Sequence, residues 1–558
     1  MNSVFMWRDI QLRIGAIENF TYYDYSGLIE TDAPPYQAFS QYIKAISSTY
    51  LVISRISWRM TWQKIAKEHV DRVNAAIPKE WRIDKPVDGV SVMAVPKTSG
   101  ILTPQEVEIT ESTATDLVKK MAARELSSVA VTTAFCKRAA LAHQLGLETT
   151  MGYVAWIGKY DTEDSVLVTL LYNAGAVFFC KTSVPQSLMV CEVVNNIIGR
   201  TVNPRNKNWS CGGSSGGEGA MVGLRGGIIG IGTDIGGSIR IPSAFNFLYG
   251  LRPSHGRLPY GKMANSMEGQ ETVHSVCGPL THSIADMKLF MTSVLAESPW
   301  SYDSKVIPMP WRQSEEDAVK AKIDAGHLVL GFYNCDGEVL PHPPILRGVQ
   351  MVVDTMKAAG HTVVPWEPYR HPYAVDLINK IYASDGGTDI HTVLKESGEP
   401  AIPNISDLVN PALPKVDMNE LWDIQLKKWK FQSEYLEKIR TFEKDFGKEL
   451  DAIIAPITPT AAVRHNQFKY YGYASAINLL DYTSVVVPVT FADKSIDKKN
   501  ESFKPLTNMD ATVQAEYDPE AYHGAPVAVQ IIGRRLTEER VMAIAGEIGK
   551  LLGNEVIP

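Results

Sequence analysis

Two clusters rich in glycine and serine lie on either side of a short apolar stretch in the middle of the chain. The first is Cys211-Gly212-Gly213-Ser214-Ser215-Gly216-Gly217-Glu218-Gly219-Ala220. The second is Gly232-Thr233-Asp234-Ile235-Gly236-Gly237-Ser238-Ile239-Arg240-Ile241-Pro242. The residues between them include Ile228-Ile229-Gly230-Ile231-Gly232, which predict a short buried strand. A flexible linker would need neither this strand nor the apolar ending of the second cluster, so we interpret the clusters as two structured turns.

Glycine-rich turns of this kind suit nucleophilic attack on a carbonyl group. Glycine permits tight backbone conformations in which several N–H groups point inward. Such N–H groups can stabilise the oxyanion that forms when a carbonyl carbon is attacked. Ser238 ends the second turn and is the candidate nucleophile, although a serine hydroxyl needs a nearby base. A nucleotide-binding loop is disfavoured, because no GxxxxGK[ST] motif occurs and Ile235 stands where GxGxxG requires its third glycine.

The rest of the chain shows the pattern of an α/β protein. It has 558 residues, of which 45% are hydrophobic and 21% are charged, as in ordinary globular proteins. Predicted strands alternate with predicted helices, which indicates a layered α/β domain. The predicted strands lie at 166–171, 176–180, 228–232, 328–332, 452–455 and 484–487. The predicted helices lie at 62–77, 129–143, 346–358, 419–446 and 537–552, and a polar stretch at 496–520 predicts a surface loop.

Composition and motifs exclude several classes of function. The net charge is -7 and the basic residues are scattered, so we expect no nucleic-acid partner. The six cysteines form no CxxC pair and no Cys/His cluster is present, so we expect free thiols and no metal. No signal peptide and no long apolar run is visible, so we expect a cytoplasmic protein without a membrane span. No feature of the sequence indicates an oligomeric state, so a homo-oligomer remains one of the alternatives.

The quoted clusters resemble the signature of the amidase family. The resemblance continues through Gly250-Leu251-Arg252-Pro253-Ser254-His255-Gly256-Arg257 and ends near Gly524-Ala525-Pro526-Val527-Ala528-Val529-Gln530. It is nearest to the fungal acetamidase type of general amidase, and fatty-acid amide hydrolase is a more distant relative. The resemblance implies one large domain at 60–558, with a mixed central sheet covered by helices on both faces. Residues 1–59 would be an N-terminal extension of unassigned role.

The resemblance also implies a Ser–cis-Ser–Lys mechanism without a cofactor. Ser238 would be the acyl-ester nucleophile, and Ser214, preceded by a cis peptide bond from Gly213, would be the bridging serine. The backbone N–H groups of Ile235, Gly236, Gly237 and Ser238 would form the oxyanion site. Leu188 would line the substrate site. A neutral lysine would accept a proton from Ser214, and burial would have to lower the pKa of that lysine.

The segment that should carry this lysine is missing from the sequence. Family members place the lysine in a G-[VL]-P-[VI]-[SA]-[VL]-K-[DE] segment, a short distance before a glycine-threonine turn that resembles residues 146–152 here. Immediately before that turn stands the family's earlier helix, so a helix and a strand are absent at about 144–145. Lys137, Lys159 and Lys181 are poor substitutes, because Lys137 lies on a charged helix face and the other two match no base position. We favour a coding segment omitted from the sequence over a degenerate amidase.

The sequence therefore predicts hydrolysis of a small carboxylic amide to acid and ammonia, impaired in the chain as it stands. The alternatives are a non-catalytic amidase-like protein that binds an amide ligand and, more weakly, an amidotransferase subunit that modifies charged tRNA. We expect Asp234 and Arg240 to form a buried structural ion pair. We expect Glu218 to make a favourable contact with a helix dipole. Cys211 and Cys277 are expected to be inert, and His255 and His274 to be packing residues.

Overall fold

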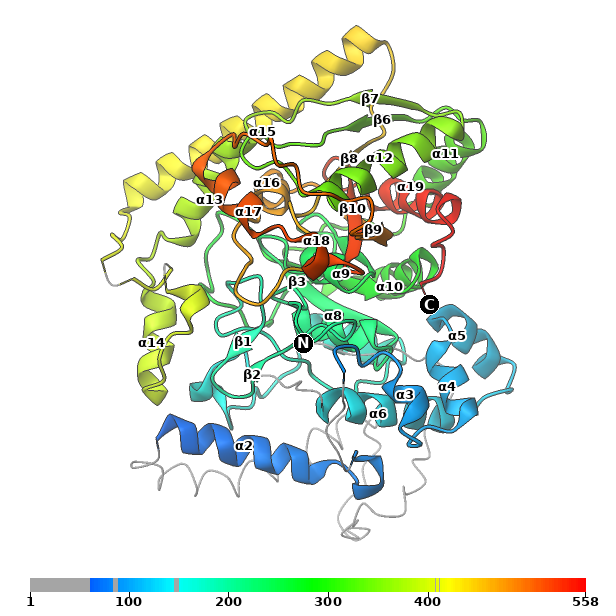
Figure 1. Cartoon of the computed structure of the whole chain (residues 1–558), viewed down its shortest axis with the longest axis vertical. Coiled ribbons are helices and arrows are strands. Elements are labelled where there is room, and N and C mark those ends of the chain that lie inside the picture. Colours follow the sequence, from blue (N-terminus) through cyan, green and yellow to red (C-terminus); the bar gives the residue numbers. More distant parts are fainter. Residues whose placement is uncertain (1–60, 84–88, 145–149, 407, 411, 558) are drawn as a thin grey trace.

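The central element of the molecule is an eight-stranded mixed sheet (Figure 1). The computed structural model describes residues 61–83, 89–144, 150–406, 408–410 and 412–557. The predicted extension at 1–59 lies outside these residues. The strand order is β3-β5-β4-β9-β10-β8-β6-β7, with antiparallel pairs from β3 to β8 and parallel pairs β8-β6 and β6-β7. These strands are β3 (Ile229–Asp234), β4 (Tyr249–Arg252), β5 (Val276–Thr281), β6 (Val329–Phe332), β7 (Thr362–Pro365), β8 (Ala452–Ala455), β9 (Ser484–Phe491) and β10 (Pro526–Ile532). A separate small hairpin pairs β1 (Val194–Asn195) with β2 (Gly199–Arg200).

Helices cover both faces of the sheet, as the family resemblance implied. Alternate strand residues point to opposite faces, and the neighbours Ile453 and Ile454 accordingly belong to different buried clusters. The Ile454 cluster includes α10 (Ile284–Ala296), α12 (Pro343–Ala358) and α19 (Glu538–Leu551). The Ile453 cluster includes α13 (His371–Tyr382), α15 (Met418–Phe446) and α16 (Gly472–Leu480).

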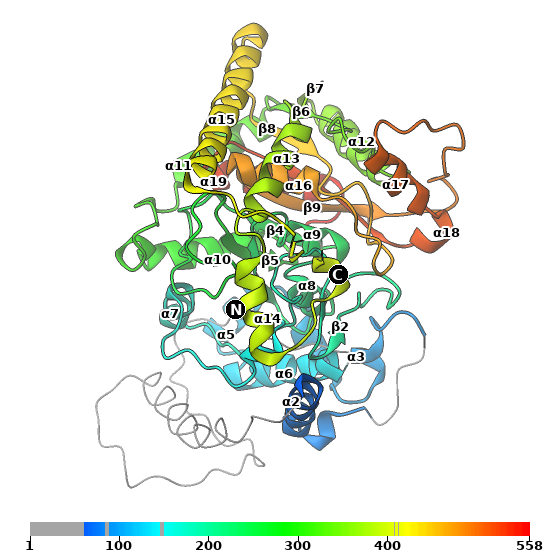
Figure 2. The ribbon, with the colours of Figure 1, turned by 90° about the vertical axis from the view of Figure 1, so that its left-hand side faces the viewer.

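The remaining helices surround this core (Figures 1 and 2). The early part of the chain forms α2 (Trp62–Ala76), α3 (Val95–Thr98), α4 (Pro104–Glu111), α5 (Ala114–Ala122), α6 (Ser128–Gln144) and α7 (Val166–Asn173). The middle contributes α8 (Gly216–Gly223), α9 (Arg240–Phe245), α11 (Gln313–Asp324) and α14 (Thr388–Ser397), and the later part α17 (Asn508–Glu516) and α18 (Pro519–Tyr522). Figure 2 shows α17 and α18 on the side of the molecule opposite α15. Predicted helices at 62–77, 129–143, 346–358, 419–446 and 537–552 are all confirmed, to within a few residues at each end.

Three local predictions were wrong or incomplete. Residues 166–171 form the first part of helix α7 and not a strand, because Ser165 caps the helix at Val168 and the long apolar side chains pack into the main core. Residues 176–180 join no strand of the described sheet and are half-buried at Val177, Phe178 and Phe179. The polar stretch 496–520 contains helix α17, whose N-cap Thr507 accepts a hydrogen bond from the N–H of Asp510.

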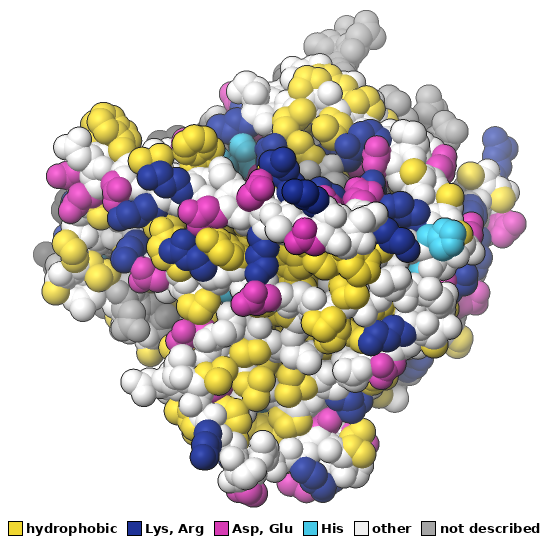
Figure 3. Space-filling view, turned by 90° about the horizontal axis from the view of Figure 1, so that it is seen from above, with side chains coloured by type: hydrophobic (Ala, Val, Ile, Leu, Met, Phe, Trp, Pro, Cys, Tyr) yellow, Lys and Arg dark blue, Asp and Glu magenta, His cyan; other side chains and the backbone are white. Residues whose placement is uncertain are grey.

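The described surface carries no large patch of one charge sign on the face seen from above. Figure 3 shows lysine and arginine side chains interspersed with acidic and hydrophobic ones on that face. No helix in the described ranges is both long enough and apolar enough to cross a lipid bilayer.

Candidate active site

The two glycine-serine clusters meet at the carboxyl end of β3. The first cluster leads into α8, and the second links β3 to α9. The N–H of Ser215 donates to the carbonyl of Ser238 at 3.1 Å, which joins the two turns directly. The peptide bond between Gly213 and Ser214 is cis, as the resemblance implied. The side chains of Ser214 and Ser238 are nearly enclosed, with residue exposures of 2% and 6%.

Close backbone packing explains why glycine occurs in these turns. The N–H of Gly217 donates to the carbonyl of Ser183 at 3.0 Å, and a Cβ at Gly217 would lie 2.2 Å from that oxygen. Gly237 has φ +124°, a conformation that residues with a Cβ rarely adopt. A Cβ at Gly237 would also lie 2.8 Å from the Cβ of Ala474. The glycines therefore permit turns that other residues would force apart.

Asp234 organises the second turn through its carboxylate. It accepts hydrogen bonds from the N–H of Gly237 at 2.8 Å and of Ile239 at 3.2 Å. The guanidinium of Arg240 binds the same carboxylate through two nitrogens, at 3.0 and 3.1 Å. Burial alone would raise the pKa of Asp234, but Arg240 and its other partners hold the pKa below the ordinary value. The predicted buried structural ion pair is therefore confirmed.

Three of the four predicted oxyanion N–H groups are free to bind a ligand. The N–H groups of Ile235, Gly236 and Ser238 have no acceptor among the described residues. The N–H of Gly237 is different, because it is already bonded to Asp234. We therefore correct the predicted role of Gly237 from donor to shape-determining residue. Buried N–H groups without partners are rare in folded proteins, so this turn has the properties of an anion-binding site.

Two residues that the sequence analysis missed hold this turn in place. Tyr382, at the end of α13, donates its hydroxyl hydrogen to the carbonyl of Ile235 at 2.6 Å. Asn478, on α16, donates to the Asp234 carboxylate at 2.8 Å. Both lie more than a hundred residues from the turn in sequence. No local motif marks them, so only the packing of α13 and α16 reveals them.

Leu188 lies in a loop beside the site. It is half-buried, has φ +65° and donates its N–H to the carbonyl of Pro185 at 3.2 Å. Met189 packs against the buried cluster that contains Tyr382, and a Cβ added to Gly213 would lie 2.7 Å from the backbone of Cys191 in the same loop. The loop is therefore near the turn, while contact of Leu188 with a substrate stays a prediction.

No lysine in the described part of the chain is placed to act as the base. Lys137 forms an ion pair with Glu106, with 2.7 Å between Nζ and Oε1. Lys159 pairs with Glu396 at 2.6 Å, and Lys181 is exposed. Within the described ranges, no basic side chain is hydrogen bonded to the hydroxyl of Ser214 or Ser238.

Glu218 lies beside the outer edge of β3 and is fully buried. Its carboxylate accepts a hydrogen bond from the hydroxyl of Thr182 at 2.6 Å and from the N–H of Ile231 at 3.0 Å. Burial raises the pKa of Glu218 to about 7. The carboxylate therefore binds the edge of the sheet. The sequence analysis predicted only a contact with a helix dipole and missed this role. Ser215 binds the same edge, accepting from the N–H of Thr233 at 3.0 Å.

The other candidate nucleophiles and ligands do not form a second active centre. Cys211 and Cys277 are buried, and burial raises the pKa of each thiol to about 12, which agrees with an inert role. The rings of His255 and His274 stack with centroids 3.7 Å apart, as expected for packing residues. In the parts of the chain that the structure describes, no group of three His, Cys, Asp or Glu side chains could hold a metal ion.

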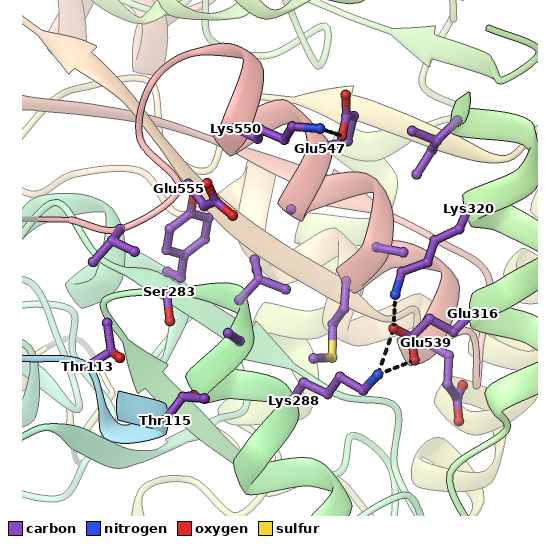
Figure 4. A pocket seen from close by; sticks show the side chains of 18 of the residues that line it. Thr113, Thr115, Ser283, Lys288, Glu316, Lys320, Glu539, Glu547, Lys550 and Glu555 are labelled. Atoms are coloured by element: carbon purple, nitrogen blue, oxygen red, sulfur yellow. Dashed lines mark hydrogen bonds and ion pairs between the residues drawn. The ribbon is translucent and has the colours of Figure 1, made fainter. Parts of the chain in front are cut away.

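A cavity of about 560 Å³ lies away from the two serines, between α5, α10, α11 and α19 (Figure 4). On its wall, Lys288 and Lys320 both bind the carboxylate of Glu316, at 2.7 and 2.6 Å. Each lysine therefore has a carboxylate partner, although the three side chains together carry one excess positive charge.

Comparison with known proteins gives a consistent relationship. The model of the amidase family matches residues 141–542. The acetamidase of Emericella nidulans is 63% identical over 545 residues, covering 89% of this chain and 100% of that protein. The acetamidase of Aspergillus oryzae is 59% identical over 542 residues, covering 88% of this chain and 99% of that protein. The structure of a fatty acid amide hydrolase superposes with a TM-score of 0.81 at 30% identity, covering 90% of this chain and 96% of that one.

The alignments also reveal a difference in length inside the matched region. Since 89% of 558 residues is about 497, the 545 aligned positions of the Emericella protein include about 48 without a counterpart here. The same calculation for the Aspergillus protein, with 88% of 558 residues against 542 positions, gives about 51. The family match, the two acetamidases and the fold agree on one conclusion: the chain belongs to the amidase family.

Proposed function

We propose that this protein is built to hydrolyse small carboxylic amides, with Ser238 as nucleophile and Ser214 as the bridging serine. The observation that carries the proposal is the turn at 235–238, which ends at Ser238 and in which the N–H groups of Ile235, Gly236 and Ser238 have no acceptor among the described residues. The two relatives are acetamidases by name, which supports a small acyl group in the substrate.

In the proposed reaction, the Ser238 oxygen attacks the amide carbon and its proton passes to Ser214. The oxyanion that forms is stabilised by the N–H groups of Ile235, Gly236 and Ser238. The C–N bond then breaks, the nitrogen leaves as ammonia after protonation, and water hydrolyses the acyl ester. No cofactor takes part in these steps.

The group that would accept the proton from Ser214 is not found among the described residues, and we propose that it belongs to the segment of about 48 residues that the relatives possess. Loss of one member of a coupled catalytic unit commonly reduces the rate by several orders of magnitude. We therefore expect the chain to be a poor catalyst as it stands. The second candidate function, binding of an amide ligand without turnover, rests on this same observation.

The first prediction tests the nucleophile. We expect a fluorophosphonate probe to label the protein slowly, because the oxyanion site favours attack by Ser238 while the base that would activate this serine is missing, and we expect Ser238→Ala to abolish the labelling. The matched control is Ser243→Ala, which removes another fully buried serine hydroxyl only five residues away. Labelled peptides would be identified by mass spectrometry.

Equal labelling of Ser238→Ala and the parent would refute the proposal. Ammonia release from acetamide separates the two candidate functions. Any release that depends on Ser238 excludes pure ligand binding, whereas amide binding with neither labelling nor release supports it.

A further inference from the structure

Tyr382 contacts the proposed oxyanion turn. The amidase reaction described above gives this contact no role. Its hydroxyl donates to the carbonyl of Ile235, with 2.6 Å between the two oxygens. The residue is the last of α13 and is 6% exposed. The phenol therefore reaches the turn from a helix that follows it by more than a hundred residues in the chain.

The chemistry of the peptide group gives this contact a consequence. In a trans peptide the C=O of one residue and the N–H of the next lie in one plane and point in opposite directions. The C=O of Ile235 and the N–H of Gly236 belong to the same peptide group. Because Tyr382 fixes the direction of the C=O, it also fixes the direction of the Gly236 N–H, which has no acceptor among the described residues.

The surroundings leave the phenol little freedom to move. A Cβ added to Gly236 would lie 2.8 Å from the Tyr382 hydroxyl oxygen, so the ring lies directly against this peptide. Tyr382 is part of the buried cluster that includes Tyr473 and Ile477 of α16. Burial keeps the pKa of Tyr382 well above its ordinary value, so the hydroxyl stays protonated and able to donate.

We propose that Tyr382 is a positioning residue for amide hydrolysis, which aims the N–H of Gly236 at the oxyanion by holding the carbonyl of Ile235. This inference rests on the proposed function of the same turn. Asp234 performs the complementary task on the next peptide, since it binds the N–H of Gly237. Together the two contacts orient neighbouring N–H groups differently. The N–H of Gly237 points to the Asp234 carboxylate, and the N–H of Gly236 is left for the substrate.

The test compares Tyr382→Phe with Tyr517→Phe. Each variant removes one buried phenolic hydroxyl that donates to a backbone carbonyl at 2.6 Å, but Tyr517 bonds the carbonyl of Asp497, outside the turn. We measure the rate of fluorophosphonate labelling and the Kd of benzamide. For Tyr382→Phe we expect labelling to be slower by about tenfold to a hundredfold and the Kd to change less than twofold, because only the oxyanion contact is lost. Tyr517→Phe should change neither.

Two results would overturn the inference. One is labelling of Tyr382→Phe at the rate of the parent. The other is weakening of benzamide binding by the same factor as labelling, which would indicate general collapse of the pocket. If the parent is not labelled at all, the proposed function fails, and amide hydrogen exchange of the peptide 233–241 still decides the positioning role. Faster exchange in Tyr382→Phe than in the parent and Tyr517→Phe supports it, and unchanged exchange rejects it.

Discussion

At the scale of the single residue, Glu218 shows how burial links the site to pH. Its carboxylate is fully enclosed and binds Thr182 and the N–H of Ile231 at the edge of β3. Burial raises its pKa from the ordinary 4.5 to about 7. The folded protein therefore holds one more proton than the unfolded chain between these two values.

This pKa predicts that Glu218 makes stability fall as pH rises. Since the folded state binds more protons, the contribution is fully present below pH 4.5 and is lost as pH rises through about 7. The difference amounts to up to about 3 kcal/mol at about 1.4 kcal/mol per pH unit. Glu218→Gln should remove this dependence, because its amide can accept from Ile231 and donate to Thr182 without ionising.

The measurement is the urea midpoint of unfolding at pH 5 and pH 8, for the parent and for Glu218→Gln. We expect the parent to lose more stability than the variant between the two values. An equal loss in both proteins would show that Glu218 is already ionised, or equally solvated, in the folded state.

At the scale of the element, the start of α15 is the clearest example of local sequence fixing a boundary. Asp417 accepts a hydrogen bond from the N–H of Glu420 at 2.9 Å, and Glu420 accepts one from the N–H of Asp417 at 2.9 Å. This reciprocal pair satisfies two N–H groups that the helix itself cannot bond. The 29-residue helix therefore begins at Met418, close to the residue that its apolar pattern predicted.

Asp417→Ala should loosen the first turn of α15. Loss of an N-cap costs about 1 kcal/mol, which corresponds to about fivefold faster amide exchange in that turn if it opens locally. The control is Thr61→Ala at the start of α2, where the threonine makes no cap hydrogen bond and exchange should change less than twofold. Exchange in α15 that is unaffected by Asp417→Ala would mean that packing alone holds the turn.

At the scale of the whole molecule, the amidase fold is assembled without about 48 residues that its relatives contain. Strand β3 lies at one end of the described sheet, and side chains of Glu218 and Ser215 bind N–H groups of its outer edge. Within residues 176–180, predicted as a strand, only Val177 has a β-bridge, and the segment belongs to no strand of that sheet. These features support the absence of a helix and a strand beside the outer edge of β3.

We predict that the natural transcript carries about 48 additional codons between those for Gln144 and Leu145, including one for a lysine. Sequencing the messenger RNA across these codons checks the prediction. An uninterrupted message would contradict it and would favour a degenerate amidase, in which case ammonia release should be absent even at high protein concentration.

Local pattern predicted much of this architecture, because helices and buried strands are marked by periodicity that each segment carries in itself. Helix α6, capped by Ser127, and strand β8 are examples. Residues 166–171 were predicted wrongly because a short apolar run fits a buried strand and a buried helix equally well, and the cap at Ser165 decides between them. The glycine-serine clusters likewise predicted an oxyanion-type turn with Ser238 as candidate nucleophile, since their spacing is local, whereas the role of Ser214 was implied by the family resemblance.

The sequence by itself indicated the family and placed Ser214 and Ser238 in two glycine-rich turns, because those properties depend on neighbouring residues. Only the tertiary structure showed that Tyr382 and Asn478 hold the turn from distant helices. Such contacts depend on how α13 and α16 pack against the sheet. The local sequence of α13 or α16 does not specify this packing, so the contacts can be identified only in the folded chain.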